Sequence, residues 1–434
     1  MSDPSFDDGN SPAKGRRLRF FDDIYRPEAK ILRFLSVLFF FGVSYGLYLG
    51  IRTNYLVEIV GISQGFEWGL VEVFRELPGL FLVLILALMY KFTDSRLFKI
   101  GVALSAGGIV GFLFTTTNQF FMTKAFVVIF MVVFSTGEHI LMPLRSSIAM
   151  ALAKQEKSGA ALGINSSLNQ LGHIFGLLLV MGIFFVLDRA GYDRNDIAGF
   201  RLIFGISMGL MVTAAIVVLA LQETALKAPR QRFYFARKFR KFYILEVFYG
   251  GRKQIFSTFA PLVLVSFYGA PAFIMAMLRT VSSGFSMVLA PVVGKLIDRV
   301  GYKAVMVADS ILLIIVCSIY GFAHIVFPKE TAFIIICVTF IVDALISMGR
   351  MAANVYAKRI SSSQEEVTAT LSTGISVDHV ISISMALLGG TIWSFSATEG
   401  REGFVVLFVF AAILGLAKCL YTLTIKKSEE ADTN

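Results

Sequence analysis

The sequence predicts an all-α membrane protein with twelve transmembrane helices arranged as two pseudo-symmetric six-helix bundles. Apolar residues make up 56% of the chain and charged residues only 16%, whereas soluble proteins carry roughly 25% charged residues. Twelve apolar runs, separated by short loops, are each long enough to cross the roughly 30 Å hydrocarbon core of a bilayer. A set of charged residues also recurs at a spacing of 204 residues, which indicates that one six-helix unit has been duplicated.

The apolar runs follow one another at regular intervals. We expect transmembrane helices near residues 32–59, 65–91, 97–117, 120–152, 160–187, 199–221, 243–268, 271–293, 304–327, 331–357, 367–394 and 402–424. These runs divide the chain into an N-terminal tail (1–30), a first bundle (31–221), a basic linker (222–242), a second bundle (243–425) and a C-terminal tail (426–434). The N-terminal tail is charged and lacks a short apolar core followed by a cleavage site, so it is not predicted to be a signal peptide.

The internal repeat relates the two halves residue by residue. At the constant spacing, Arg75, Lys91, Asp94 and Lys99 return as Arg279, Lys295, Asp298 and Lys303. With a slip of one position, Glu138 and Arg145 return as Asp343 and Arg350. Parallel repeats inside an apolar chain are typical of transporters, whose substrate site lies between the two repeats.

Lysine and arginine are concentrated in alternate loops, and positive residues that flank a helix resist translocation. The basic loops carry Lys91, Arg96, Lys99, Lys154, Lys157, Lys295, Arg299, Lys303, Lys358 and Arg359. The opposite loops carry far fewer, among them Lys329 and Arg401. We therefore predict a plasma-membrane protein with both termini in the cytoplasm. The basic linker is more typical of contact with anionic membrane lipids than of nucleic-acid binding.

The sequence contains no pattern typical of an enzyme. It has no phosphate-binding glycine loop, no His-Glu-x-x-His zinc motif and no Gly-x-Ser-x-Gly nucleophile turn. The three cysteines, Cys317, Cys337 and Cys419, fall inside predicted helices, so neither a disulfide framework nor a metal site is expected. No cofactor is expected either.

The loop Gly294–Lys303 reads Gly-Lys-Leu-Ile-Asp-Arg-Val-Gly-Tyr-Lys and resembles the G-x-L-x-D-R-x-G-R-K signature of the major facilitator superfamily. Tyr90–Lys99 is a degraded first copy, and Ser158–Gly163 with Gly172 and Gly176 is similar to the start of the family's fifth helix. The resemblance implies a monomeric secondary transporter of the bacterial inner membrane. Such a protein works by alternating access, as a symporter or antiporter driven by a proton or a counter-substrate.

The signature loops predict a latch on the cytoplasmic side. Carboxylates favour helix N-termini and cations favour C-termini, so these loops can bind neighbouring helix ends in one conformational state and release them in another. The candidate gating residues are Asp94, Lys99, Asp298, Arg299 and Lys303, with Arg145 and Arg350 inside the helices. The alternative is that the loops are topological anchors without a role in gating.

Ionisable residues inside predicted helices usually face a cavity or a partner. Glu138 and Asp343 each precede an arginine by seven residues, nearly two helical turns, so we expect each member of these pairs to meet a partner on another helix. They are candidates for proton coupling, with structural ion pairs as the alternative. Glu72 and Glu76 are further proton-coupling candidates, although Arg75 on the same helix face can neutralise both.

Polar residues also line one side of the fifth and eleventh predicted helices. Asp378 is the leading proton site, because a carboxylate beside the imidazole of His379 would have coupled protonation. Asn165, Asn169 and His379 are candidate substrate ligands. The alternative is that these side chains only hydrogen-bond to neighbouring helices.

Positive charge in the first and seventh helices favours an anionic substrate. Arg52 and Tyr55 in the first helix, with Arg252 in the seventh, are the candidate ligands, in a local pattern similar to organic-anion branches of the superfamily. Alternatively, Arg52 neutralises Glu58 or an acid of the second helix. The competing function is proton-driven efflux of amphipathic compounds, which the 42 phenylalanines and 16 methionines would suit.

Overall fold

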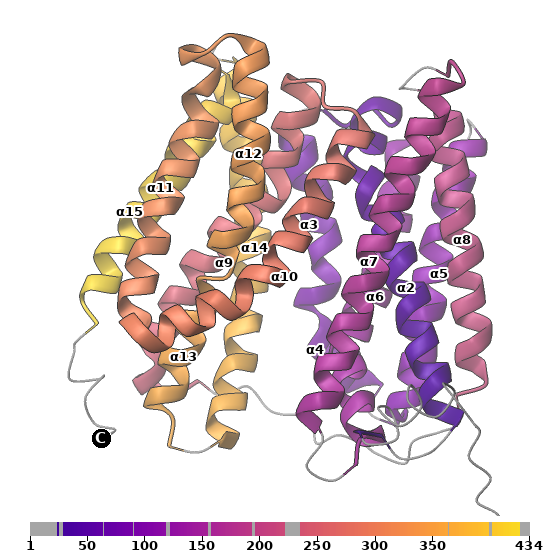
Figure 1. The fold of residues 1–434 in the computed structure, drawn as a ribbon, viewed down its shortest axis with the longest axis horizontal. Coiled ribbons are helices and arrows are strands. Elements are labelled where there is room, and N and C mark those ends of the chain that lie inside the picture. Colours follow the sequence, from indigo (N-terminus) through magenta and orange to yellow (C-terminus); the bar gives the residue numbers. More distant parts are fainter. Residues whose placement is uncertain are drawn as a thin grey trace, which may run out of the picture.

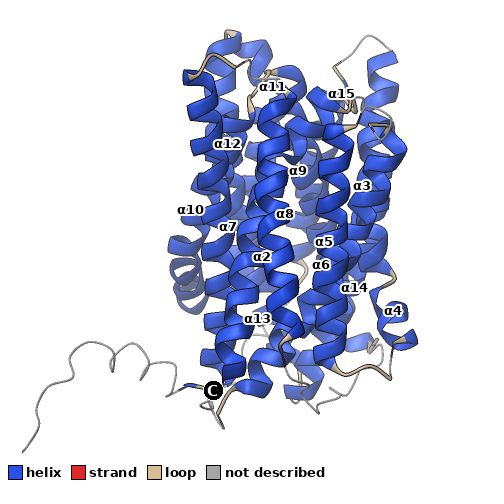
Figure 2. Cartoon of the chain, turned by 90° about the vertical axis from the view of Figure 1, so that its right-hand side faces the viewer, coloured by secondary structure: helices blue, strands red, loops and turns tan. Residues whose placement is uncertain are grey.

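A computed structural model describes residues 24–25, 29–63, 65–89, 91–118, 122–154, 158–192, 196–221, 235–362, 364–398 and 402–425. Within these ranges the regular structure is helical, apart from one isolated bridge between Tyr25 and Ala153. The helices form two groups that stand side by side, one from each half of the sequence (Figure 1). Seen from the side, they run roughly parallel to one another, as expected for a membrane-spanning bundle (Figure 2).

The described residues of the first half form eight helical elements. They are α2 (Ala29–Asn54), η1 (Tyr55–Ile59), α3 (Gly65–Leu80), α4 (Leu82–Leu88), α5 (Asp94–Thr117), α6 (Lys124–Leu152), α7 (Ser158–Arg189) and α8 (Ile197–Leu219). The second half contains η3 (Arg237–Phe239), α9 (Arg240–Leu262), η4 (Val263–Phe267), α10 (Ala272–Val300), α11 (Tyr302–Val326), α12 (Lys329–Ser347), α13 (Arg350–Ile360), α14 (Gln364–Thr398) and α15 (Gly403–Leu423). Most of the basic linker and both tails lie outside the described residues.

Ten of the described helical segments are long and apolar enough to cross a membrane. The two expected spans that fall short, 65–91 and 243–268, correspond to α3 with α4 and to α9. Both segments carry charged residues into the interior, such as Glu72, Arg75 and Arg252. The total of twelve spans therefore stays a prediction.

Two expected helices are interrupted. The second predicted span divides at Phe81, shortly after Pro78, whose ring cannot donate a backbone hydrogen bond. The tenth divides at Met348 and Gly349, where the Tyr249 hydroxyl donates to the carbonyl oxygen of Gly349 at 2.9 Å. Both breaks lie in the lower part of the bundle in Figure 1, and the second places α13 next to α9.

The two halves meet where α3 packs on α14 and where α10 packs on α7 and α2. Glycine allows a close approach of α3 and α14: a Cβ atom on Gly390 would lie 2.6 Å from the carbonyl oxygen of Gly65. Such small-residue crossings allow helix backbones to pack closely in membranes. The Trp68 indole also donates to the carbonyl oxygen of Thr258 at 2.7 Å, which joins α3 to α9.

Candidate functional site

A cavity of about 270 Å³ lies between the two halves. Its wall is formed by α2 and α7 from the first half and by α9, α10 and α12 from the second. The ionisable residues that line it are His173, Arg252, Lys253, Arg279 and Asp343. The cavity therefore has a predominantly cationic lining, and it lies at the position where the repeat predicts a substrate site.

Arg252 and Lys253 are adjacent in α9 but have different acidic partners. The Arg252 guanidinium forms an ion pair with Asp343 of α12 and also donates to the Asp343 carbonyl oxygen at 3.0 Å. The Lys253 ammonium lies 2.9 Å from a carboxylate oxygen of Asp378 in α14. Both cations are therefore neutralised by residues of the second half.

Arg279 differs from these cations. Its Nε and Nη2 atoms are buried and have no hydrogen-bond partner among the described residues. Other cations on the described helices of the second half have a carboxylate partner: Arg252, Lys253, Arg350 and Lys418. Arg279 thus places a positive charge in the wall of the cavity without a paired carboxylate among the described residues.

The repeat explains why Arg279 lacks an acid. Its counterpart, Arg75, binds Glu72 at 2.8 Å and forms a second ion pair with Glu76. The positions 204 residues after these two acids are Ala276 and Thr280, which cannot neutralise a cation. The arginine is therefore present in both halves, and its acidic partners are present only in the first.

The interior charges of α2 and α3 neutralise each other. Arg52 lies 3.1 Å from Glu72, so two arginines face the two carboxylates of Glu72 and Glu76. Arg52 is absent from the lining of the cavity, and its pairing matches the alternative of a neutralised acid. Tyr55 also lies elsewhere: its hydroxyl bonds to that of Thr115 at 2.7 Å, and its ring is fully buried.

Three members of the pairs separated by seven residues have partners on other helices, as the spacing predicts: Arg145, Asp343 and Arg350. Arg145 donates to the side-chain oxygen of Asn169 in α7 at 2.8 Å. Arg350 forms ion pairs with Glu246 of α9 and, at 3.3 Å, with Asp378 of α14. Glu138 is buried on α6, and Asn165 is buried on α7. These contacts fix helices within each half.

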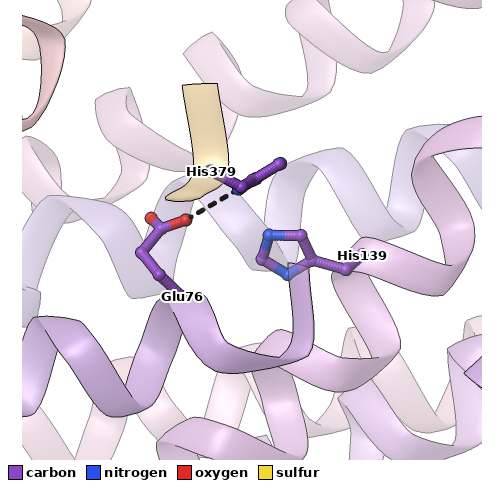
Figure 3. Close-up of side chains that lie close together, drawn as sticks. All are labelled: Glu76, His139 and His379. Carbon is purple, nitrogen blue, oxygen red and sulfur yellow. Dashed lines mark hydrogen bonds and ion pairs between the residues drawn. The ribbon is translucent and has the colours of Figure 1, made fainter. Parts of the chain in front are cut away.

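Asp378 and His379 point in different directions. Asp378 lies between Lys253 and Arg350, inside the second half. His379 faces the first half, where its Nδ1 lies 3.2 Å from a carboxylate oxygen of Glu76, with the ring of His139 beside it (Figure 3). The expectation that these neighbours form one coupled pair is wrong, because successive residues of a helix project about 100° apart.

The structure shows contacts of two of the candidate gating residues, while their role in a latch stays a prediction. Asp94, in the first turn of α5, accepts a hydrogen bond from Ser147 of α6 at 2.5 Å. Lys303 donates to the carbonyl oxygens of Leu423 and Ile425, at 2.9 and 2.6 Å, and so caps the end of α15. These contacts join helices of the same half. Lys99 is half-buried and Arg299 is exposed, while the Asp298 side chain lies outside the described residues.

Comparison with known proteins identifies the family. The sequence pattern of the Major Facilitator Superfamily matches residues 33–377. The chain belongs to this superfamily. It is therefore a multi-pass membrane transporter rather than an enzyme, as the signature loop predicts. No curated protein sequence matches this member of the superfamily.

Solved structures of other transporters share its fold. The nucleoside transporter NupG is 15% identical with a TM-score of 0.70, and the alignment covers 92% of this chain and 100% of NupG. A D-xylose-proton symporter is 15% identical with a TM-score of 0.68, covering 94% and 100% of the two chains. A peptide transporter POT in complex with sulfate is 13% identical with a TM-score of 0.67, covering 93% and 97%. At these identities the similarity establishes the fold alone.

Proposed function

We propose that this transporter carries a small organic anion across the membrane by alternating access, and that the anion binds in the cavity at Arg279. The observation that supports this most directly is at Arg279, whose Nε and Nη2 atoms are buried without a hydrogen-bond partner among the described residues. A cation left unpaired in a low-dielectric interior is unstable, and removing the partner from such a pair typically costs several kcal/mol. A bound carboxylate or phosphate would supply the missing charge through paired N–H···O bonds.

Lys253 offers a route to proton coupling. It lines the cavity, and its ammonium is held by Asp378. An anion that bridges Arg279 and Lys253 would draw Lys253 away from Asp378, and the released carboxylate would then be free to take up a proton. We infer that movement of the anion is coupled to movement of a proton, either in the same direction or in exchange for it. Asp378 is the proposed coupling residue. Arg350 remains beside Asp378 and would limit this protonation.

The test is uptake into proteoliposomes of a panel of monocarboxylates, dicarboxylates, phosphate esters and amphipathic cations, with and without a pH gradient. We expect one anionic class to be transported, and we expect Arg279→Gln to weaken its binding about 10- to 100-fold. This range corresponds to hydrogen bonds to a charged group, worth about 1.5–3 kcal/mol. Arg279→Lys should retain part of the binding. The positive charge remains, but the planar guanidinium, which can donate two parallel hydrogen bonds to the anion, is lost.

Arg201→Gln is the matched control. Arg201 is exposed on α8, and its Nε donates to the carbonyl oxygen of Thr116 at 2.7 Å, away from the cavity. This variant should transport like the wild type. Anion transport that is equal in Arg279→Gln and Arg201→Gln would overturn the proposal. Movement of only neutral or cationic amphiphiles would instead favour the efflux function.

We also propose that the chain resides in a bacterial inner membrane as a monomer, with both ends in the cytoplasm. The asymmetry of basic residues between opposite loops supports this orientation. Single cysteines at Lys91 and Lys329, in a variant whose native cysteines are replaced, would test it with a membrane-impermeant thiol reagent. The first position should be protected in intact cells and the second labelled. The reverse pattern would refute the orientation.

A further inference from the structure

Three potential metal ligands converge where the two halves meet. Glu76 comes from α3, His139 from α6 and His379 from α14 (Figure 3). Each offers one ligand atom, and these atoms all lie within 4.8 Å of one another. Glu76 and His139 are buried, and His379 is half-buried. This cluster is separate from the cavity that contains Arg279.

The hydrogen bonds of His139 leave one ring nitrogen available. Its Nδ1 lies 2.8 Å from the Ser135 carbonyl oxygen and 3.1 Å from the Ser135 hydroxyl. That hydroxyl donates its hydrogen to the Arg75 carbonyl oxygen at 2.5 Å, so toward His139 it can only accept. Both partners of Nδ1 are thus acceptors, which places the proton on Nδ1 and leaves a lone pair on Nε2. Metal-binding histidines are commonly oriented in this way by a backbone carbonyl.

The available nitrogen points toward the other two ligands. A Cβ atom on Gly79 would lie 2.6 Å from His139 Nε2 and 2.9 Å from His379 Cε1, so the missing side chain of this glycine leaves room between the rings. Arg75 forms its ion pair with Oε1 of Glu76, and Oε2 is the oxygen that faces His379. Two imidazole nitrogens and one carboxylate oxygen therefore face a common point.

We propose that Glu76, His139 and His379 bind a divalent first-row transition metal, with Zn²⁺ as the best match. Two histidines and one glutamate form a known zinc ligand set, which leaves a fourth position for water. Tetrahedral zinc places its ligand atoms about 3.3 Å apart, so the rings must move inward by about 1–1.5 Å. Side-chain rotation beside Gly79 allows this movement.

A metal at this position would connect the two halves, because α3 and α6 belong to the first and α14 to the second. The consequence for transport rests on the proposed alternating-access function: a bridging ion would hold the halves together at α3 and α14 and slow the cycle. We therefore expect Zn²⁺ to act as an inhibitor and not as a substrate. Binding itself does not depend on that function, so it can be tested separately.

The experiment is Co²⁺ titration of the detergent-solubilised full chain, purified with a tag that contains no histidine. We expect visible d–d absorption bands of a low-coordinate Co²⁺ site, which an equimolar amount of Zn²⁺ abolishes. His139→Gln should weaken Co²⁺ binding at least 10-fold, and Gly79→Ala should do the same by filling the space between the rings. Each variant is checked for a monodisperse elution profile, so that misfolding is not read as lost binding.

His324→Gln is the matched control. The chain has four histidines, and His324 forms a separate pair with Glu402 at 2.5 Å, between α11 and the start of α15. This variant should bind Co²⁺ like the wild type. Absence of the bands in the wild type, or their persistence in His139→Gln, would overturn the proposal. Neither outcome affects the anion site at Arg279.

Discussion

Restoring the missing acid beside Arg279 should convert the anion site into an internal ion pair. In the first half, the adjacent residues Arg75 and Glu76 form such a pair directly. Thr280 occupies the position equivalent to Glu76, and its side chain is half-buried. Thr280→Glu therefore places a carboxylate where the first half shows that the geometry permits pairing.

The expected effect follows from competition for one guanidinium. A substrate anion would have to displace the new carboxylate, and hydrogen bonds to charged groups contribute about 1.5–3 kcal/mol. This corresponds to a rise in the apparent Kd of about 10- to 100-fold. The concentration dependence of anion uptake into proteoliposomes, with substrate binding measured separately in detergent, gives this ratio. Cationic amphiphiles should not show the same loss.

Thr280→Gln is the matched control, since it has nearly the same size and no charge. Both variants lose the bond that the Thr280 hydroxyl donates to the Ala276 carbonyl oxygen at 2.8 Å, so its contribution cancels in the comparison. We expect Thr280→Gln to stay within about 3-fold of the wild type. If Thr280→Glu and Thr280→Gln bind the anion equally well, Arg279 is not its ligand.

Three further predictions concern other charges and contacts. Asp378→Asn should abolish the dependence of transport on external pH while permitting exchange of the anion, and an unchanged pH profile would exclude Asp378 as the coupling residue. Lys418→Met leaves the buried carboxylate of Asp309 unpaired and should destabilise the protein by about 3–5 kcal/mol. Thermal unfolding in detergent should show partial recovery in the Lys418→Met, Asp309→Asn double variant, and no recovery would contradict the pairing. Gly390→Val should reduce thermal stability more than the same change at Gly284, which has open space around it, because α3 and α14 can no longer approach.

The fold can be predicted from the sequence because two of its features, the membrane-spanning helices and the duplication, leave patterns in the sequence itself. Apolar runs report the length of each span, and a constant spacing of charged residues reports the duplication. The breaks within the helices are harder to predict from the sequence. α12 ends at Ser347, and the carbonyl oxygen of Gly349 just beyond it accepts a hydrogen bond from Tyr249, one hundred residues earlier; no local pattern around Gly349 contains that contact.

The candidate site can be predicted from the sequence only in part, since spacing along a helix indicates which residues share a face but not which helix lies opposite. Arg350 was correctly expected to find partners on other helices. Their adjacency in sequence predicts that Asp378 and His379 act together, yet the structure assigns them to different networks. His139 was missed because a single histidine in an apolar helix has no distinguishing pattern; its partners come from α3 and α14.

For Arg279, the informative feature of the repeat is a difference between its two copies: the arginine recurs, but its two acidic partners do not. A duplicated unit begins with the same charges in both halves, and a buried arginine remains tolerable only while something neutralises it. The first half retains Glu72 and Glu76 for this purpose, whereas the second half has Ala276 and Thr280. If the arginine has kept its place after its acids were lost, then a ligand must supply the negative charge at least during part of the cycle. The proposed negative charge of the substrate therefore rests on the asymmetry between the halves and not on their symmetry.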